Sequence, residues 1–179
     1  MPVLLTMLDG KTVCIREAAA GDGTAILEFA NTLFESTDMV LTQPQEFKFT
    51  QAQEEEMIKE HAERADALLM VATAGCKVVG LMNFSCNRKL KINHWGELGI
   101  SVLPAYHKNG IGKAMLGALI TWAAEISQIE KLCLNVFHTN APAIRLYKSL
   151  GFIAEGRQKK AVRQPDGSYV DMITMSYFK

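Results

Sequence analysis

The sequence has no excess of charge of either sign, no long apolar run and little cysteine. Its 179 residues include 19 Lys+Arg and 19 Asp+Glu, so the formal net charge at pH 7 is zero. This balance provides no field that would favour nucleic acid or an anionic membrane as a partner. The longest apolar stretch is far too short to span a membrane, and the first residues lack the basic and apolar regions of a secretory signal. The sequence therefore predicts a protein with no nucleic-acid partner and no membrane partner.

The cysteines and histidines lack the spacing of metal ligands. The four cysteines show no C-x-x-C pattern and fall in or beside apolar runs: Cys14, Cys76, Cys86 and Cys133. His94 and His138 also stand apart from other ligand types. We therefore expect reduced thiols, a cytoplasmic protein and no bound metal.

The length and composition are typical of one globular domain. Hydrophobic residues make up 49% of the chain and charged residues 21%, and no repeat, linker or low-complexity segment divides it. We therefore expect a single domain over residues 1–179 with a sizeable core. Periodicity and turn signals predict an α/β order of strand, two helices, three strands, helix, strand, helix and two strands. The expected strands cover 11–17, 67–74, 77–85, 94–102, 131–136, a segment from 152 and 169–177; the helices cover 21–34, 50–65, 113–126 and 141–150.

A glycine-rich loop, residues 106–112, is the most informative segment. Its sequence, between a strand-like run and a helical run, is Tyr106-His107-Lys108-Asn109-Gly110-Ile111-Gly112. A loop that enters a helix N-terminus directs unpaired backbone N–H groups and the positive end of the helix dipole at one point, which favours a phosphate or pyrophosphate. The two glycines allow a ligand to approach the backbone. An ordinary strand–helix turn, with glycine for close packing, is the alternative.

Two known phosphate-binding motifs do not fit this loop. A P-loop requires Gly, four residues and then Gly-Lys-Ser/Thr, but here His107 holds the first glycine position and Ala114 follows Lys113. The dinucleotide pattern G-x-G-x-x-G begins at Gly110 but has Met115 in place of its third glycine. A nucleotide-dependent dehydrogenase is therefore disfavoured.

A second segment has clear helix boundaries. Asn140 is a typical N-cap before the expected helix, Pro142 suits its first turn, and Gly151 suits the position after its end. Together the two segments read Val102-x-x-x-Tyr106-His107-x-x-Gly110-Ile111-Gly112 and Asn140-x-x-Ala143-x-x-Leu146-Tyr147-x-x-x-Gly151-Phe152.

These segments resemble two motifs of the GNAT superfamily of acyl-CoA-dependent N-acetyltransferases. The first is similar to its R/Q-x-x-G-x-G/A pyrophosphate loop and the second to its N-x-x-A-x-x-L-Y-x-x-x-G-F segment. The C-terminal pattern resembles a bacterial branch that acetylates small amines, amino acids or protein N-termini: Glu155-Gly156 … Asp166-Gly167-x-Tyr169-Val170-Asp171 … Met175. The resemblance implies a mixed, mostly antiparallel, splayed sheet of about seven strands with four helices, and acetyl-CoA as co-substrate.

The resemblance also implies which residues bind the coenzyme. His107 stands where the family usually has Arg or Gln; we expect it to contribute mainly its backbone N–H. Lys108 and Lys113 either supply positive charge to the phosphates or are solvated residues near a helix end. The full set is Val102, Leu103, His107, Lys108, Asn109, Gly110, Ile111, Gly112, Lys113, Asn140, Ala143 and Tyr147.

Acetyl transfer requires an oxyanion donor, a base and an acid. An alkyl ammonium has a pKa near 10, so the acceptor must lose a proton before it attacks the thioester. By resemblance, the backbone N–H of Val102 or Leu103 stabilises the oxyanion. Glu97 is the candidate general base, acting through a water; the alternative is a solvated strand residue. Tyr147 is the candidate general acid for the departing thiolate; the alternative is a core or coenzyme-positioning aromatic.

The acceptor is not determined by the sequence. A small-molecule amine and a peptide N-terminus, as in ribosomal-type enzymes, are both open as acceptors. A homodimer is likewise open as the oligomeric state. Glu35, Asp38 and Glu46 would suit a cationic acceptor, whereas Arg88, Lys89 and Lys91 would suit an acidic one. A member that binds acyl-CoA without turnover, as a sensor, is the alternative of a different class.

Overall fold

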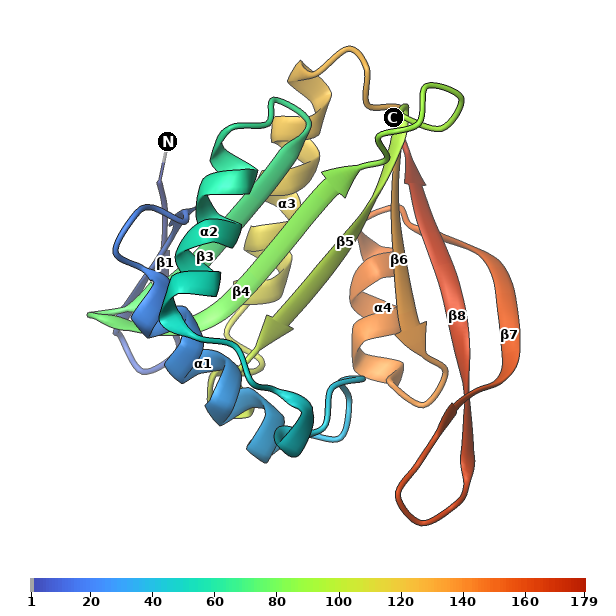
Figure 1. Ribbon diagram of the computed structural model, residues 1–179, viewed down its shortest axis with the longest axis horizontal. Coiled ribbons are helices and arrows are strands. Elements are labelled where there is room, and N and C mark those ends of the chain that lie inside the picture. The colour runs from blue at the N-terminus through green and yellow to red at the C-terminus, as the bar shows by residue number, and fades with distance from the viewer. Residues whose placement is uncertain (1) are drawn as a thin grey trace.

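An eight-stranded sheet forms the centre of the computed structural model, which describes residues 2–179 (Figure 1). Its strand order is β1-β2-β3-β4-β5-β6-β8-β7. The β5–β6 pair is parallel and every other neighbouring pair is antiparallel. The strands are β1 Val3–Thr6, β2 Thr12–Glu17, β3 Ala67–Ala74, β4 Lys77–Cys86, β5 Trp95–Val102, β6 Lys131–Phe137, β7 Ile153–Arg163 and β8 Tyr169–Phe178.

Helices cover both faces of the sheet. Two of them, α1 and α2, lie in front of β3 and β4 in Figure 1, and α3 lies behind the sheet. Two buried apolar clusters correspond to these layers: one packs α1 and α2 on the sheet, and the other packs α3 and α4 on it. The helices are α1 Gly23–Ser36, α2 Gln51–Ala62, α3 Ile111–Glu125 and α4 Ala141–Ser149, with short 3-10 helices η1 Pro44–Glu46 and η2 Pro104–Tyr106.

The expected mixed, mostly antiparallel α/β fold with four helices is confirmed, with one more strand than the seven expected. The additional strand is β1, which pairs with β2 from Val3↔Ile15 to Thr6↔Thr12. It is short and largely exposed, so it lacks the alternation of apolar and polar residues that identifies a half-buried strand in sequence. The segment between α1 and α2 also contains η1.

The sheet opens between β5 and β6. Their pairing runs from Trp95↔Lys131 to Glu97↔Cys133 and goes no further within the described residues. Beyond it, residues 98–102 of β5 and 134–137 of β6 diverge, as Figure 1 shows. A strand edge that leaves its neighbour exposes backbone N–H and C=O groups, so this opening can receive a ligand with amide groups.

Local capping signals set the helix ends close to where the sequence places them. Thr50 caps α2 by accepting a hydrogen bond from the Gln53 N–H at 3.4 Å. Asn140 caps α4 by accepting from the Ala143 N–H at 3.2 Å. Gly151 follows α4 with φ of +93°, a conformation that favours glycine.

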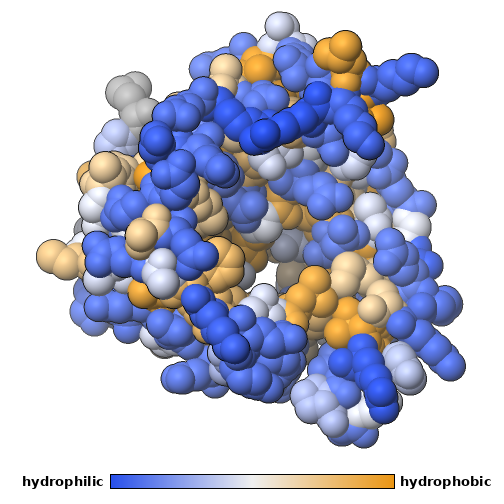
Figure 2. Space-filling model, viewed as in Figure 1, coloured by the Kyte–Doolittle hydropathy of each residue, from blue (hydrophilic) through white to orange (hydrophobic). Residues whose placement is uncertain are grey.

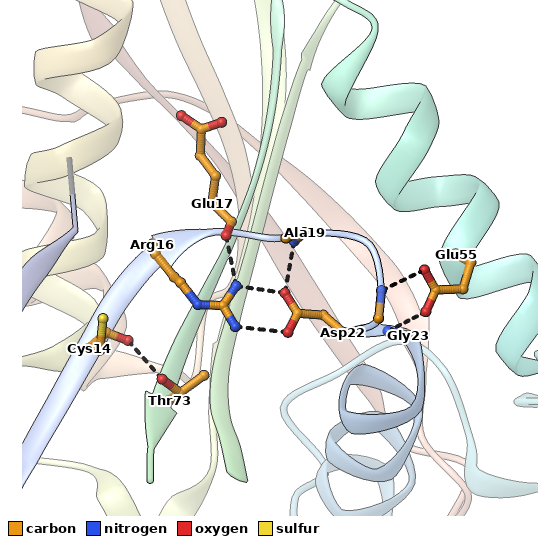
Figure 3. Close-up of polar contacts among 9 residues, drawn as sticks. Cys14, Arg16, Glu17, Ala19, Asp22, Gly23, Glu55 and Thr73 are labelled. Carbon is orange, nitrogen blue, oxygen red and sulfur yellow. Dashed lines mark hydrogen bonds and ion pairs between the residues drawn. The ribbon is translucent and has the colours of Figure 1, made fainter. Parts of the chain in front are cut away.

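The start of α1 is capped from another helix (Figure 3). The Glu55 carboxylate of α2 accepts hydrogen bonds from the N–H groups of Gly21 at 3.1 Å and Gly23 at 3.0 Å. The preceding Asp22 side chain instead forms a two-pronged ion pair with Arg16 of β2, at 2.6 and 2.8 Å. These contacts fix α1 to α2 and to the sheet, and α1 in turn forms one wall of the cleft described below.

Within residues 2–179, no helix combines the length and the apolar character needed to cross a membrane. The same residues contain no group of three or more His, Cys, Asp or Glu side chains placed to hold a metal ion.

Candidate active site

A cavity of about 540 Å³ lies where the end of β5, the start of α3 and one side of α4 meet. Its lining contains most of the predicted coenzyme residues. Those lining it are Val102, His107, Lys108, Gly110, Ile111, Gly112, Lys113, Asn140, Ala143 and Tyr147. The structure thus brings together two segments separated by about thirty residues, while Leu103 and Asn109 are not part of the lining.

The N-terminus of α3 presents free backbone donors to this cavity. The first helical hydrogen bond runs from the Ala114 N–H to Gly110 O at 3.0 Å. Within the described chain, the N–H groups of Ile111, Gly112 and Lys113 have no backbone acceptor. These donors lie at the positive end of the α3 dipole, so the geometry suits an anionic ligand. The Lys108 and Lys113 side chains lie beside them and are exposed.

The two glycines of the loop have different structural roles. Gly110 has φ of +79°, a left-handed conformation that permits the turn into α3. Gly112 has helical geometry, and a Cβ at this position would lie 3.3 Å from Leu146 Cδ2 of α4. The second glycine therefore also allows α3 and α4 to approach each other at the base of the cavity.

The backbone N–H of His107, which we expected to bind the phosphates, has an acceptor within the protein. That N–H donates to Pro104 O at 3.1 Å, which closes η2. The ring contributes instead: His107 Nε2 lies 2.8 Å from Val102 O, and because a carbonyl only accepts, the ring donates. His107 therefore ties the loop to the end of β5.

Asn109 also holds the loop in place. Its Oδ1 accepts from the Leu8 N–H at 3.2 Å, and its Nδ2 donates to Tyr106 O and His107 O. These contacts occupy the side chain with the protein itself, so Asn109 shapes the loop.

The hydrogen-bond pattern of β5 distinguishes between the two predicted oxyanion donors. The Leu103 N–H donates to Val79 O of β4 at 2.9 Å, which leaves it unavailable. Successive N–H groups of a strand point to opposite sides, so the Val102 N–H points away from β4, into the opening toward β6. Val102 is therefore the remaining candidate.

Tyr147 lies at the junction of α4 and the opening of the sheet. Its side chain is buried, with 8% of its surface exposed, and its ring packs against Phe152 with centroids 5.9 Å apart. Burial raises the pKa of the Tyr147 hydroxyl to about 12, because a phenolate would lose its hydration. The hydroxyl thus stays protonated at neutral pH, as a proton or hydrogen-bond donor must.

Glu97 lies at the closed end of the opening, in the last rung that pairs β5 with β6. It is exposed, and alternation along β5 places it on the same face as Gly99 and Ser101. Ser101 lines the 540 Å³ cavity, whereas Glu97 does not. Glu97 does not line the second cavity described below either, so action on a group in the cleft would require an intervening water.

A second cavity, of about 360 Å³, continues from the first into the opening of the sheet. Ser101, Asn140 and Tyr147 line both cavities, so together they form one cleft. In Figure 2 a hollow lies on this face of the molecule, with hydrophobic residues at its margins. Its walls come from α1, the following loop, β4, β5, β6 and β8.

Among the described residues, no charged side chain lines this second cavity. The acidic residues considered for a cationic acceptor and the basic residues considered for an acidic one all lie outside it. Besides Thr42, Ser101 and Asn140, two asparagines of the strands provide polar groups: Asn83 of β4 and Asn135 of β6. The sequence analysis did not identify them; a single asparagine within an apolar strand run is the signal that marks both.

Comparisons with known proteins agree with this architecture. The model of the acetyltransferase (GNAT) family matches residues 33–152. The L-amino acid N-acetyltransferase AaaT of Escherichia coli is 30% identical over 118 residues, which cover 66% of this chain and 72% of that protein. The crystal structure of a GNAT-family acetyltransferase from Streptococcus pneumoniae has a TM-score of 0.90 at 26% identity, covering 93% of this chain and 99% of that one. An acetyltransferase structure from Salmonella typhimurium, which contains its cofactor acetyl-CoA, has a TM-score of 0.81 at 21% identity and covers 93% of each chain.

Proposed function

Because the chain belongs to the acetyltransferase (GNAT) family, we propose that it transfers the acetyl group of acetyl-CoA to a primary amine by direct attack within a ternary complex. One observation carries the proposal: a continuous cleft joins the free N–H groups of α3 to the opening between β5 and β6. The end of the cleft at the N-terminus of α3 suits the pyrophosphate of CoA, and the end between β5 and β6 suits the reacting thioester.

The residues of the first cavity fit the coenzyme. The N–H groups of Ile111, Gly112 and Lys113 can donate to the phosphate oxygens, with Lys108 supplying further positive charge. The amide groups of the pantetheine arm can pair with the exposed edge of residues 98–102. The small side chain of Ala143 in the lining leaves room for that arm beside α4.

In the proposed reaction, Glu97 accepts a proton from the acceptor ammonium through a water. The neutral amine nitrogen then attacks the thioester carbon and forms the C–N bond, while the carbonyl oxygen gains negative charge. The Val102 N–H, which points into the opening, donates a hydrogen bond to that oxygen. The C–S bond breaks as the carbonyl re-forms, and the sulfur carries away the electron pair. The nitrogen, left cationic by the attack, releases its extra proton to solvent water, so the product is the neutral amide.

Tyr147 serves the leaving group in this scheme. Tyr147 lines both cavities, and in this scheme its hydroxyl donates its proton, or a hydrogen bond, to the departing sulfur. A thiol with a pKa near 8.5 is already a fair leaving group, so the gain is limited to about 10²-fold. The raised pKa of about 12 keeps the hydroxyl protonated before this step.

Release of free thiol from acetyl-CoA, measured against a panel of primary amines, tests the proposal. The panel should contain amino acids, amino-acid amides, polyamines and N-terminal peptides. We expect release that depends on both protein and amine. A protein that binds acetyl-CoA but releases no thiol with any amine would instead support the acyl-CoA sensor.

A further inference from the structure

We propose that the acceptor is the α-amino group of an amino acid, or of the first residue of a peptide or amide, that has a hydrophobic side chain. Asn135 binds the α-carbonyl oxygen of this acceptor. The inference rests on the proposed acetyl transfer and specifies which amine the second cavity receives. A free amino acid and the first residue of a peptide or amide share this chemistry.

The walls of the second cavity support the hydrophobic part of the proposal. Aromatic and aliphatic side chains of α1 and the following loop face those of the opened sheet. They include Phe29, Leu33, Phe34, Met39, Val40, Leu41, Leu81, Ile100, Leu134, Val136, Phe137 and Met172. A volume of about 360 Å³ accommodates one amino-acid-sized group. A charged side chain of the acceptor would lose hydration in this space without an ion-pair partner among the lining residues.

Asn135 presents its amide nitrogen as a free donor. The Thr174 hydroxyl of β8 donates to Asn135 Oδ1 at 2.8 Å, which fixes the orientation of the amide. The Nδ2 group, a donor only, is then directed away from Thr174, and Asn135 itself is exposed in the lining. A carbonyl or carboxylate oxygen is the group that matches such a donor.

Asn83 supplies a second amide from the other side of the opening. Its side chain lies over Gly99 of β5, where a Cβ would come within 2.7 Å of Asn83 Oδ1. Gly99 thus makes room for the Asn83 amide, which lines the second cavity. The two asparagines flank the face of β5 that carries Glu97, so an amine between them lies on the side of the proposed base.

The test compares kcat/KM for five acceptors with acetyl-CoA: L-phenylalaninamide, L-phenylalanine, 2-phenylethylamine, spermidine and L-glutamate. We expect at least about tenfold higher values for one or both phenylalanine compounds than for spermidine or glutamate. The amide and the free acid distinguish a peptide-like source from a free amino acid. A higher kcat/KM for spermidine or glutamate than for both phenylalanine compounds overturns the inference while leaving acetyl transfer intact.

Variants test the role of the carbonyl donor. In Asn135→Ala, kcat/KM for the preferred phenylalanine compound should fall about tenfold, whereas that for 2-phenylethylamine, which lacks the carbonyl, should stay the same. Asn31→Ala, an exposed asparagine of α1 outside both cavities, is the matched control and should change neither value. An equal fall for both acceptors, or no fall, contradicts a carbonyl contact. Absence of thiol release with all five acceptors, despite acetyl-CoA binding, would instead reject the proposed function.

Discussion

Gly112 at the start of α3 faces Leu146 of α4 so closely that a Cβ would lie 3.3 Å from Leu146 Cδ2. The same glycine exposes its N–H to the cavity, so one position serves both helix packing and anion binding. Close packing of the two helices and access to the backbone therefore impose the same residue.

Gly112→Val should weaken acetyl-CoA binding by more than about tenfold, or about 1.4 kcal/mol. The branched side chain would displace Leu146 and hold the pyrophosphate away from the N–H groups. Calorimetric titration measures the affinity. Gly117→Ala is the control, because a Cβ there meets nothing within 4 Å, and it should bind normally. A folded Gly112→Val protein with unchanged affinity would remove the anion-site assignment.

Glu97→Gln should lower kcat/KM for the acceptor near neutral pH and leave acetyl-CoA affinity unchanged. The amide cannot accept the proton that the ammonium must lose. The deficit should shrink as the pH approaches the acceptor's pKa, about 8 for a peptide α-amino group and about 10 for an alkyl amine, because free amine then becomes abundant. A pH–rate profile identical to that of the unmodified protein would exclude Glu97 as the base.

Tyr147→Phe should lower kcat severalfold, up to about 10²-fold, with little effect on folding. The ring and its contact with Phe152 are kept, while the donor to sulfur is lost. Acetyl-CoA affinity should change by less than about 1.5 kcal/mol, the net value of one hydrogen bond. Tyr147→Ala separates packing from chemistry and should destabilise the fold by about 3–5 kcal/mol. If the Tyr147→Phe variant keeps the full kcat under conditions in which the chemical step limits the rate, Tyr147 is a packing residue.

Glu54→Gln should make the protein more stable at neutral pH. Glu54 of α2 is 4% exposed, its Oε2 has no hydrogen-bond partner in the described chain, and burial raises its pKa. A raised folded-state pKa means that the native state holds the proton more tightly, so stability is lost as pH rises through that pKa. The benefit of the variant should therefore be largest above that pKa and smallest in acid, where Glu54 is protonated in both states.

Urea unfolding from pH 4 to pH 8 measures this difference. Glu60→Gln, an exposed acid on the same helix, is the control and should show no such trend. A constant difference between Glu54→Gln and the unmodified protein across pH would show that ionisation of Glu54 does not affect stability.

The parts of the site that depend on neighbouring residues could be predicted from the sequence. The cap at Asn140 and the glycine that ends α4, Gly151, rest on local backbone chemistry, and the structure has both where expected. The choice between Val102 and Leu103 could not be predicted, because it depends on which N–H pairs with Val79, some twenty residues earlier.

The second cavity depends even more on long-range pairing. Asn83 and Asn135 meet in one cavity only because β4, β5 and β6 align in a particular register and because β6 then leaves β5. Periodicity indicates which residues share a face of one strand but not which strands are neighbours. The acidic and basic residues considered for the acceptor are conspicuous in the sequence, yet they lie outside the cavity. Sequence alone could not show this, because the lining depends on which elements are neighbours in space.

Mass spectrometry of a reaction containing the protein, acetyl-CoA and L-phenylalaninamide tests the central claim most directly. Direct transfer predicts N-acetylated amide and free CoA in equal amounts, with no change in the protein's own mass when acetyl-CoA is added alone. L-phenylalanine and an N-terminal peptide, run in parallel, cover the other amine sources. Thiol release without an acetylated amine from any of them, or a stably acetylated protein that forms before the amine is added, would contradict the account.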